Sequence, residues 1–401
     1  MFAGIINIGY MKKSVFIILC TIFTLLILGI WAYLFTFGTP KSGSEIFANF
    51  GLGNKEESSP VIVDTTTVDV SDSTSEGVPQ ALKQLTLRPV AGATFSPNSD
   101  AVRYVEQGTG HIYSINLISG AESLISGTTL PGTREALFSK DGAQVAISIF
   151  DGAELKTLVG SVGESATQSF TGVSLPQGAQ NIFFDTATNT LMYTLEGGAG
   201  ISGYSYNTKK ETGVQLFSIP LRDVKVLWGG ESIYVYTTPT ASQTGYLYKI
   251  SKNKLQYVAE GGLGLMGFTF KDTSIITESN ETEAVSSAIT FGEKTPLPVT
   301  IIPEKCVGDK TFLYCAVPRD FGNMETFPDN WYKGVTSYSD TLWEIDIDNG
   351  VATVLSNFEL ESGRQIDVSK IGISEDNTRL YFINKNDNTL WMFDSRVLSG
   401  E

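Results

Sequence analysis

The chain has 401 residues, of which 42% are hydrophobic, so it is long enough to bury one large core or two ordinary ones. Its formal net charge is −15, which excludes a broad nucleic-acid-binding surface, because such surfaces need clustered lysine and arginine. The 40 glycines, 23 phenylalanines and 16 tyrosines favour strands and turns over helices.

An uncharged run lies close to the N-terminus. Residues 14–38, SVFIILCTIFTLLILGIWAYLFTFG, would span more than the roughly 30 Å hydrocarbon core of a membrane if they formed a helix rising about 1.5 Å per residue. Lys12 and Lys13 precede this run, so the positive-inside bias predicts a cytoplasmic segment at 1–13 and a transmembrane anchor at 14–38. A cleaved signal peptide is the alternative, but the run is long for one and AYLFTFGTP offers no A-x-A cleavage site.

Residues 39–80 differ in composition from both of their neighbours. The stretch NKEESSPVIVDTTTVDVSDSTSEGVP is rich in Ser, Thr, Asp and Glu and poor in aromatic residues. Such a segment cannot bury enough apolar surface to fold, and its like charges repel each other. We therefore expect a disordered linker at 39–80 and a globular domain at 81–401.

Beyond residue 80 the chain repeats one unit. Three stretches show it best: FSPNSDAVRYV from Phe95, FSKDGAQVAIS from Phe138 and ISEDNTRLYFIN from Ile373. Each places an apolar residue before a polar turn and an alternating apolar strand after it, which is the pattern of a hairpin. Degenerate copies of the same unit begin at Phe183, Leu227, Phe268 and Cys306.

Each hairpin is followed by a third strand and usually by a fourth. Seven hairpins, spaced 38 to 67 residues apart with four strands per unit, predict an all-β fold, a seven-bladed β-propeller. The last unit ends after its third strand, and Ala81 to Val90 contain a strand that no unit uses. We predict that this strand completes the last blade and so closes the ring.

The three best hairpins resemble those of TolB and the WD40-like (PD40) propellers. The usual SPDG turn of that group reads SPNSD at 96–100 and SKDG at 139–142, and it is lost in the middle blades. The resemblance covers roughly residues 81 to 401 as architecture, and it implies a propeller that binds proteins or envelope components. The segment around YCAVPRDF and PDNWYKGV is also similar to uncharacterised membrane-anchored bacterial propellers.

The sixth unit carries an insertion, residues 319–340, between its second and third strands. Long loops in compact domains are uncommon and often functional. One interpretation is a lip that binds peptide or glycan with Trp331 and Tyr332 as stacking platforms, and the alternative is a plug that fills the groove between blades. We predict that Phe327 is buried and that Trp331, which follows PDN, is at least partly exposed. The candidate binding residues are the insertion's aromatics: Phe321, Phe327, Trp331, Tyr332 and Tyr338.

Cys306 and Cys315 are expected to face each other across a hairpin, because CVGDKTFLYC aligns with ISEDNTRLYF. In an exported domain such a pair can form a disulfide, and two buried thiols are the alternative. Two cysteines without a nearby histidine make a poor metal site, so no metal is expected.

Catalytic patterns are nearly absent from the sequence. The single histidine, His111, begins a third strand and is expected to be structural, and no G-x-S-x-G motif occurs. The stretches DIDNG at 346–350 and NKNDN at 384–388 lack the frame and the closing Glu of a calcium loop. GGLGLMG at 261–267 has no following helix to bind phosphate. We therefore expect no enzymatic activity and no cofactor.

These features together predict a single-pass protein of a bacterial cytoplasmic membrane, with its N-terminus inside and one transmembrane helix and a flexible linker before the propeller outside. The expected function is a binding or scaffolding module of the cell envelope, with a protein or polymer as its partner and no nucleic acid. A propeller hydrolase or lyase that uses acidic side chains of the central channel is the alternative.

Overall fold

The computed structural model describes residues 80–163, 170–185, 188–208, 210–229, 232–271, 273–290 and 292–399, together with Thr24 and Leu28. The expected cytoplasmic segment, anchor and linker therefore lie outside the described residues except at those two positions and at Gln80. Within the described part, no helix is long and apolar enough to cross a membrane. The chain divides into two units, Met1–Glu76 and Gly77–Glu401, and all described strands belong to the second.

The described strands form six sheets, of which five have four strands and one has seven. Every pairing is antiparallel, and all seven predicted hairpins are present. The first sheet contains β2 (Val90–Phe95), β3 (Ala101–Glu106), β4 (Ile112–Asn116) and β5 (Glu122–Ser126). The second contains β6 (Thr133–Phe138), β7 (Gln144–Phe150), β8 (Leu155–Ser161) and β9 (Thr171–Ser174). The third contains β10 (Gln180–Phe184), β11 (Leu191–Gly197), β12 (Gly200–Asn207) and β13 (Thr212–Ile219).

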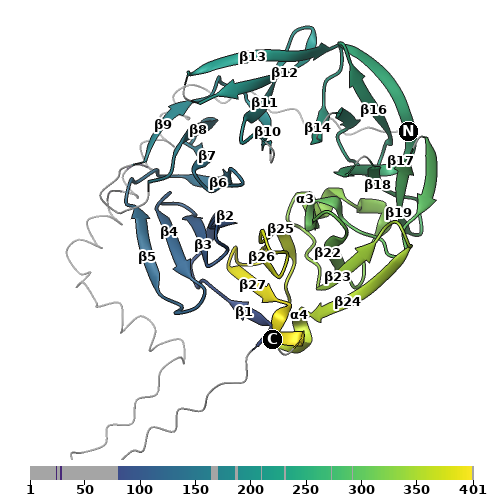
Figure 1. The fold of residues 1–401 in the computed structure, drawn as a ribbon. Helices are drawn as coiled ribbons and strands as arrows, with labels where there is room; N and C mark the ends of the chain where they lie inside the picture. Colours follow the sequence, from purple (N-terminus) through teal and green to yellow (C-terminus); the bar gives the residue numbers. More distant parts are fainter. Residues whose placement is uncertain are drawn as a thin grey trace, which may run out of the picture. The chain divides into compact units, whose positions relative to one another are not determined.

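The remaining sheets follow in sequence order around a ring, and the strands β2, β6, β10, β14 and β25 lie nearest its centre (Figure 1). The seven-stranded sheet contains β14 (Val224–Gly229), β15 (Ser232–Thr237), β16 (Thr244–Ser251), β17 (Lys254–Phe270), β18 (Thr273–Ser279), β19 (Ala284–Thr290) and β20 (Glu293–Pro296). The next sheet contains β21 (Cys306–Gly308), β22 (Leu313–Pro318), β23 (Asp340–Asp346) and β24 (Val351–Asn357). The last sheet contains β25 (Val368–Ile373), β26 (Arg379–Asn384), β27 (Leu390–Asp394) and β1 (Leu82–Gln84).

Strand β17 belongs to two groups of strands. Its first part pairs with β16 as far as Leu263, and its second part pairs with β18 from Leu263 onward. The register shifts between Leu263 and Met266, where Gly264 has a φ of +62°. Glycine adopts this left-handed conformation at little cost, so it permits one long strand to serve both groups.

The ring closes by pairing of the two ends of the domain. Strand β1 lies antiparallel to β27, with Leu82 opposite Phe393 and Gln84 opposite Trp391. The predicted closure is confirmed, although the pairing strand is shorter than expected. Closure by β1 covers the edge that β27 would otherwise expose.

Apolar residues from neighbouring sheets pack between those sheets. One cluster brings Leu342 of β23 together with Phe382 and Trp391 of the last sheet, and the rings of Phe358 and Phe382 stack 4.6 Å apart. Burial of one such aromatic side chain stabilises the fold by about 1.5–3 kcal/mol. Trp391 is 4% exposed in this core, whereas Trp343 is only partly buried against the adjacent cluster.

Candidate functional site

The insertion leaves β22 and returns at β23, and it is not a structureless loop. It contains the short helices η2 (Met324–Thr326) and α3 (Asp329–Tyr332), joined by a cis Phe327–Pro328 peptide bond. The Asn323 side chain caps η2 by accepting a hydrogen bond of 2.9 Å from the amide of Glu325. Figure 1 shows α3 beside the inner strands of the ring.

The predicted aromatic residues of the insertion are mostly buried. Phe327, Trp331 and Tyr338 are 2%, 4% and 6% exposed, and they pack in one cluster with Met266 and Ile302. The prediction that Phe327 is buried is confirmed, and the prediction that Trp331 is partly exposed is wrong.

The other two aromatic residues differ from each other. The ring of Phe321 is partly buried, 5.3 Å from that of Phe327 and 6.0 Å from that of Tyr338. Tyr332 is the most exposed of the five, at 41%. The insertion is therefore a plug over most of its length, and it presents one aromatic side chain to solvent.

The indole N–H of Trp331 has a buried hydrogen-bond partner, which offsets its loss of water. Its Nε1 donates to the two carboxylate oxygens of Asp367 over 3.1 and 3.2 Å. A buried tryptophan usually finds such a partner, and α3 turns the side chain toward it. Asp367 lies 36 residues further along the chain, just before β25, so the local sequence gave no sign of this bond.

A buried ion cluster lies under the insertion. Lys305, Asp340 and Asp367 are each 0% exposed. The Lys305 Nζ is 2.8 and 2.7 Å from the two oxygens of Asp340 and 2.5 Å from Asp367 Oδ1. Buried charges are costly unless they are paired and hydrogen-bonded, and here all three are.

Further donors complete the coordination of the two carboxylates. Asp340 accepts the amide of Val368 over 2.7 Å, and Asp367 accepts the Ser337 hydroxyl over 3.1 Å and the Tyr338 amide over 3.2 Å. Because these bonds link β23, the insertion and β25, they fix the insertion against the last sheet.

Lysine ammonium groups lie over the aromatic rings of the same cluster. Lys305 Nζ is 5.3 Å from the Trp331 ring centroid and 5.1 Å from that of Tyr338, and Lys385 Nζ is 4.4 Å from that of Trp331. Lys385 also donates to the backbone carbonyl of Trp331. Two lysines and two aspartates thus balance their charges around one tryptophan.

Burial shifts the acid–base behaviour of this cluster. Desolvation raises the pKa of Asp340 to about 6, although the Lys305 ammonium opposes the shift. Desolvation lowers the pKa of Lys385, and the charge of Asp367 opposes that shift. Desolvation is the dominant cause in both cases, as expected where water is excluded.

The insertion is also fixed on its other side, against the seven-stranded sheet. The Asp329 carboxylate accepts the Ala241 amide over 2.5 Å and the Thr240 hydroxyl over 3.3 Å. Gly264 is in close contact with the insertion, since a Cβ there would lie 2.5 Å from Pro328 Cδ. Gly264 therefore has two roles: its positive φ permits the register shift in β17, and its lack of a side chain leaves room for Pro328 of the insertion.

The exposed end of α3 meets a second polar group. The Tyr332 hydroxyl donates to the carboxylate of Glu304, which lies in η1 (Pro303–Lys305) and is exposed. Surrounding protein nevertheless raises the pKa of Glu304 by desolvation, and the bond from Tyr332 opposes this. Lys225 of β14 lies opposite Tyr236 of β15 in the sheet register.

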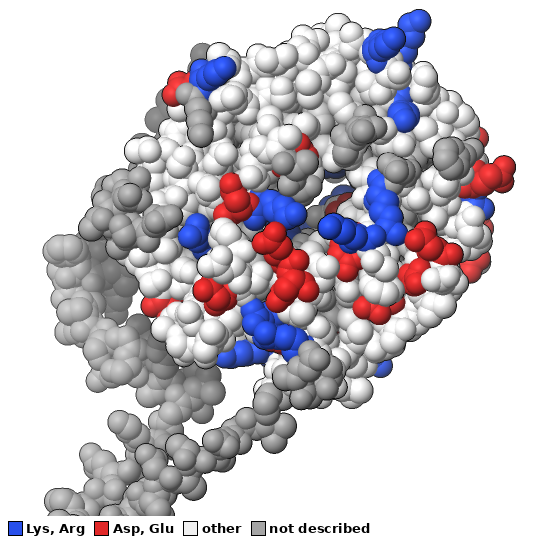
Figure 2. All heavy atoms as spheres, in the orientation of Figure 1, with Lys and Arg blue, Asp and Glu red and all other residues white. Residues whose placement is uncertain are grey.

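Acidic and basic side chains alternate on the face seen in Figure 2, around a hollow near its middle. Neither sign of charge covers this face alone. The described residues contain no group of three or more His, Cys, Asp or Glu side chains that could hold a metal ion. The DIDNG stretch forms a turn in which Asp346 accepts the Asn349 amide over 3.0 Å.

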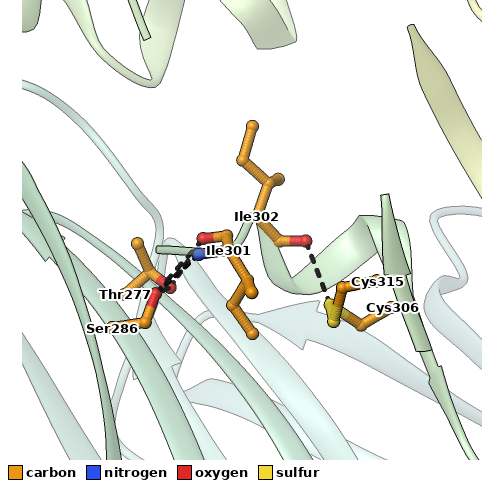
Figure 3. The surroundings of a disulfide bond; sticks show 6 residues. All are labelled: Thr277, Ser286, Ile301, Ile302, Cys306 and Cys315. Carbon is orange, nitrogen blue, oxygen red and sulfur yellow. Dashed lines mark hydrogen bonds between the residues drawn. A yellow bond between two sulfur atoms is a disulfide. The ribbon is translucent and has the colours of Figure 1, made fainter. Parts of the chain in front are cut away.

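Cys306 lies opposite Cys315 in the β21–β22 register, as expected, and their sulfur atoms are 2.10 Å apart (Figure 3). The Cys306 sulfur is 3.7 Å from the Ile302 carbonyl oxygen. The preceding residue, Ile301, exchanges hydrogen bonds with Thr277 and Ser286 of the neighbouring strands (Figure 3). The disulfide between Cys306 and Cys315 and the hydrogen bonds of Ile301 therefore anchor both ends of the segment that carries Glu304 and Lys305.

No family model matches the sequence, and no curated protein sequence matches it. Among solved structures, the β-propeller domain of the Trilobed protease from Pyrococcus furiosus aligns with 77% of this chain and 96% of its own, at 10% identity and a TM-score of 0.51. The fold is a β-propeller. The likeness to a Pyrococcus horikoshii acylaminoacyl peptidase has a TM-score of 0.52 and 12% identity over 77% of this chain.

The propeller spans 51% of the length of that peptidase, so the comparison concerns one part of a larger enzyme. TolB from Acinetobacter baumannii aligns over 52% of this chain, at 13% identity and a TM-score of 0.37. At such identities the comparisons bear on the fold alone. The propeller expected from the hairpin repeats is confirmed. The Pyrococcus furiosus domain is described as having an open velcro topology, whereas this propeller pairs β1 with β27.

Sequence reasoning missed four residues that build the site in this propeller. Lys305 ends η1, Asp367 directly precedes β25 and Lys385 directly follows β26. Only their contacts around Trp331 distinguish them from other charged residues. Glu304 was passed over as one acidic residue among 43. A usable sign was Lys305 itself, because it stands directly before Cys306, which is expected to be buried in the hairpin.

Proposed function

We propose that the propeller has seven blades and is a non-enzymatic binding module of the cell envelope. The blade count is supported by β17, whose two parts pair with different neighbours. If β17 is shared, the seven-stranded sheet consists of two four-stranded blades, which join the five four-stranded sheets.

The observation that carries the binding role is that the insertion holds Tyr332 of α3 in a fixed position beside Glu304. We call this exposed end of α3 the platform on the insertion. Here the buried ion cluster holds α3 in place, and α3 presents Tyr332 next to Glu304. Aromatic side chains on rigid supports are typical anchors of binding surfaces, since little entropy is lost on contact.

Membrane attachment is the second part of the proposal, and it rests on the sequence. The uncharged run at 14–38 follows Lys12 and Lys13 and precedes a linker rich in Ser, Thr, Asp and Glu. Protease added outside spheroplasts should release the propeller and leave the N-terminus protected. Protection of the whole domain would reverse the proposed orientation.

Capture of the full chain from intact membranes tests the binding role. The wild-type chain is cross-linked in the membrane, solubilised and purified beside Tyr332→Ala, with Tyr257→Ala as the matched control. Tyr257 is 62% exposed on β17 and lies away from the insertion in sequence and register. We expect a partner to be lost from the Tyr332 variant and retained by the control. Identical recovery from all three chains would contradict the proposal.

A propeller hydrolase or lyase is the second candidate. One observation favours it, since Glu304 is a carboxyl with a raised pKa that accepts a hydrogen bond from a tyrosine, and such groups are suited to acid–base catalysis. Incubation of the chain with envelope polymer would release products that Glu304→Gln fails to release. Intact polymer after incubation with the wild-type chain would contradict the hydrolase or lyase function, and only the binding function would remain.

A further inference from the structure

The buried ion cluster under the insertion brings an amine and two carboxyl groups into direct contact. Lys305 Nζ lies 2.8 and 2.7 Å from the two oxygens of Asp340 and 2.5 Å from Asp367 Oδ1. The carboxyl carbon of Asp340 lies between those two oxygens, about 3 Å from the nitrogen, which is the separation of a near-attack geometry. A lysine amine is a nucleophile once it has lost its proton, so this contact can become a covalent bond.

Lys305 is the only buried lysine among the residues that the structure describes. It and both carboxylates are 0% exposed, whereas the side chain of every other lysine in a described ion pair is at least 35% exposed. The rings of Trp331 and Tyr338, centred 5.3 and 5.1 Å from Nζ, help to exclude water. Buried charges are costly, and a reaction that turns an ammonium and a carboxylate into one neutral amide removes that cost.

Asp340 is the carboxyl group that is better prepared for attack. Both of its oxygens contact the amine, and its Oδ2 also accepts the Val368 amide over 2.7 Å. Such a donor stabilises the negative charge that develops on the oxygen when the carbon becomes tetrahedral. Desolvation raises the pKa of Asp340 to about 6, which favours the neutral carboxyl group that an amine attacks. Rotation about the Cβ–Cγ bond, a broad torsion, turns the face of this group toward the amine.

Asp367 is placed to accept a proton from the same amine. Its Oδ1 contacts Lys305 Nζ, and its oxygens also accept the Trp331 indole, the Ser337 hydroxyl and the Tyr338 amide over 3.1 to 3.2 Å. Hydrogen bonds donated to a carboxylate favour its ionised form, which is the form that acts as a base. The two carboxyl groups are therefore suited to different roles.

We propose that Lys305 and Asp340 form an intramolecular isopeptide bond, with Asp367 as the general base. Lys305 first gives one proton to Asp340, so that a neutral amine faces a neutral carboxyl group. The nitrogen attacks the carboxyl carbon and gives a second proton to Asp367, which returns it to the leaving hydroxyl group. One C–N bond forms, one C–O bond breaks and one water is released, so the reaction needs no further reactant.

The bond links η1 to β23 across 35 residues of the chain. It lies next to the disulfide between Cys306 and Cys315, so two covalent links hold the same sheet beneath the insertion. The ion pair, with the raised pKa of Asp340, is the state of the freshly folded chain, and the bond forms from it. The inference does not depend on the proposed binding function.

Mass spectrometry of the full chain, purified in detergent directly after synthesis and again after incubation at neutral pH, tests the bond. We expect the mass of the incubated wild-type chain to be lower by one water than its sequence with the disulfide requires. Trypsin does not cleave after an acylated lysine, so the peptide that contains Lys305 should be uncleaved there and joined to the peptide that contains Asp340. Lys271, which pairs with the exposed Asp348 over 3.0 Å, is the internal control and should be cleaved in full.

Two variants test the roles of the partners. Lys305→Arg keeps a buried cation, but its guanidinium is not deprotonated, so the mass of this variant should match its sequence. Asp367→Asn lacks the base and should lose water at least about a hundredfold more slowly than the wild-type chain.

Three results would overturn the isopeptide bond: an unchanged mass of the wild-type chain, full cleavage after Lys305, or a loss of water that maps to other residues. An equal rate in Asp367→Asn and the wild-type chain would show that Asp367 is not the base. The wild-type chain decides whether the bond exists even if a variant fails to fold.

Discussion

At the scale of single residues, the insertion depends most on Lys305. Its ammonium is wholly buried between Asp340 and Asp367 and pairs with both carboxylates. The value of the cluster lies less in its net energy than in its geometry, because a buried ion pair often contributes little over an apolar substitute. Removal of one member, however, leaves unpaired charge in the interior.

Lys305→Met is therefore expected to destabilise the domain by about 3–5 kcal/mol, because two carboxylates lose their buried counter-ion. Lys271→Met is the matched control, since Lys271 pairs with the exposed Asp348 over 3.0 Å. The control should change stability by about 1 kcal/mol or less. Denaturant unfolding of the two variants and the wild-type domain measures both changes, and equal losses would show that the ion cluster is not a structural centre.

The carboxyl of Asp340 predicts a pH dependence. Its pKa is about 6 in the folded protein against an ordinary 3.8, so the folded state binds the proton more tightly. The stability that this group contributes is therefore fully present below about pH 3.8 and is lost as the pH rises through about 6. Asp340→Asn cannot titrate, so the stability deficit of this variant should be larger at pH 4 than at pH 7.

Asp346→Asn is the control for this pH dependence and should behave in the opposite way. Hydrogen bonds from Asn349 lower the pKa of Asp346, so its contribution is present at neutral pH and is lost as the pH falls. Unfolding curves of Asp340→Asn between pH 4 and pH 7, and of Asp346→Asn between about pH 2 and pH 5, test the two signs. A deficit for Asp340→Asn that grows toward pH 7 would contradict the desolvation of this carboxyl.

At the scale of elements, the insertion is seated by its neighbours. Its position between two strands and its aromatic content could be predicted from the sequence, because hairpin repeats on either side mark its ends. The burial of Trp331 was not legible, since it depends on Asp367 and Lys385, which belong to the following sheet. The role of Gly264 was hidden for the same reason, because its contact with Pro328 crosses 64 residues of chain.

Gly264→Ala tests this seat. The new Cβ would meet Pro328 Cδ at 2.5 Å, at a backbone φ of +62°. Gly120→Ala has a comparable φ of +70° and nothing within 4 Å, so it carries the backbone strain without the contact. We expect the Gly264 variant to lose about 1–3 kcal/mol more than the control. Equal melting temperatures of the two variants would show that the insertion can shift away from residue 264 without loss of stability.

At the scale of the whole domain, the ring and its closure followed from sequence reasoning with few corrections. Alternating apolar residues and polar turns repeat seven times, and this local pattern is enough to place every hairpin. The strand left over at the start matched the strand missing at the end. The sharing of β17 between two groups was not foreseen, because a continuous strand carries no break in its apolar pattern at Gly264.

Closure of the ring predicts a difference between two truncated chains. A chain that begins at Gly77 retains β1, whereas a chain that begins at Val90 lacks it and exposes the edge of β27. The shorter chain should melt at a lower temperature and aggregate more readily, because an unpaired strand edge can pair with another chain. Calorimetry and light scattering compare the two, and identical behaviour would show that β1 does not close the domain.

A photoreactive benzophenone amino acid in place of Tyr332 tests most directly whether the platform on the insertion meets a partner. The same amino acid at Tyr257 is the control, since that position is also exposed but lies on the outer part of β17. After illumination of intact membranes, we predict an adduct of increased mass at position 332 and none at position 257. No adduct at 332, or the same adduct at both positions, would contradict a binding role for this face.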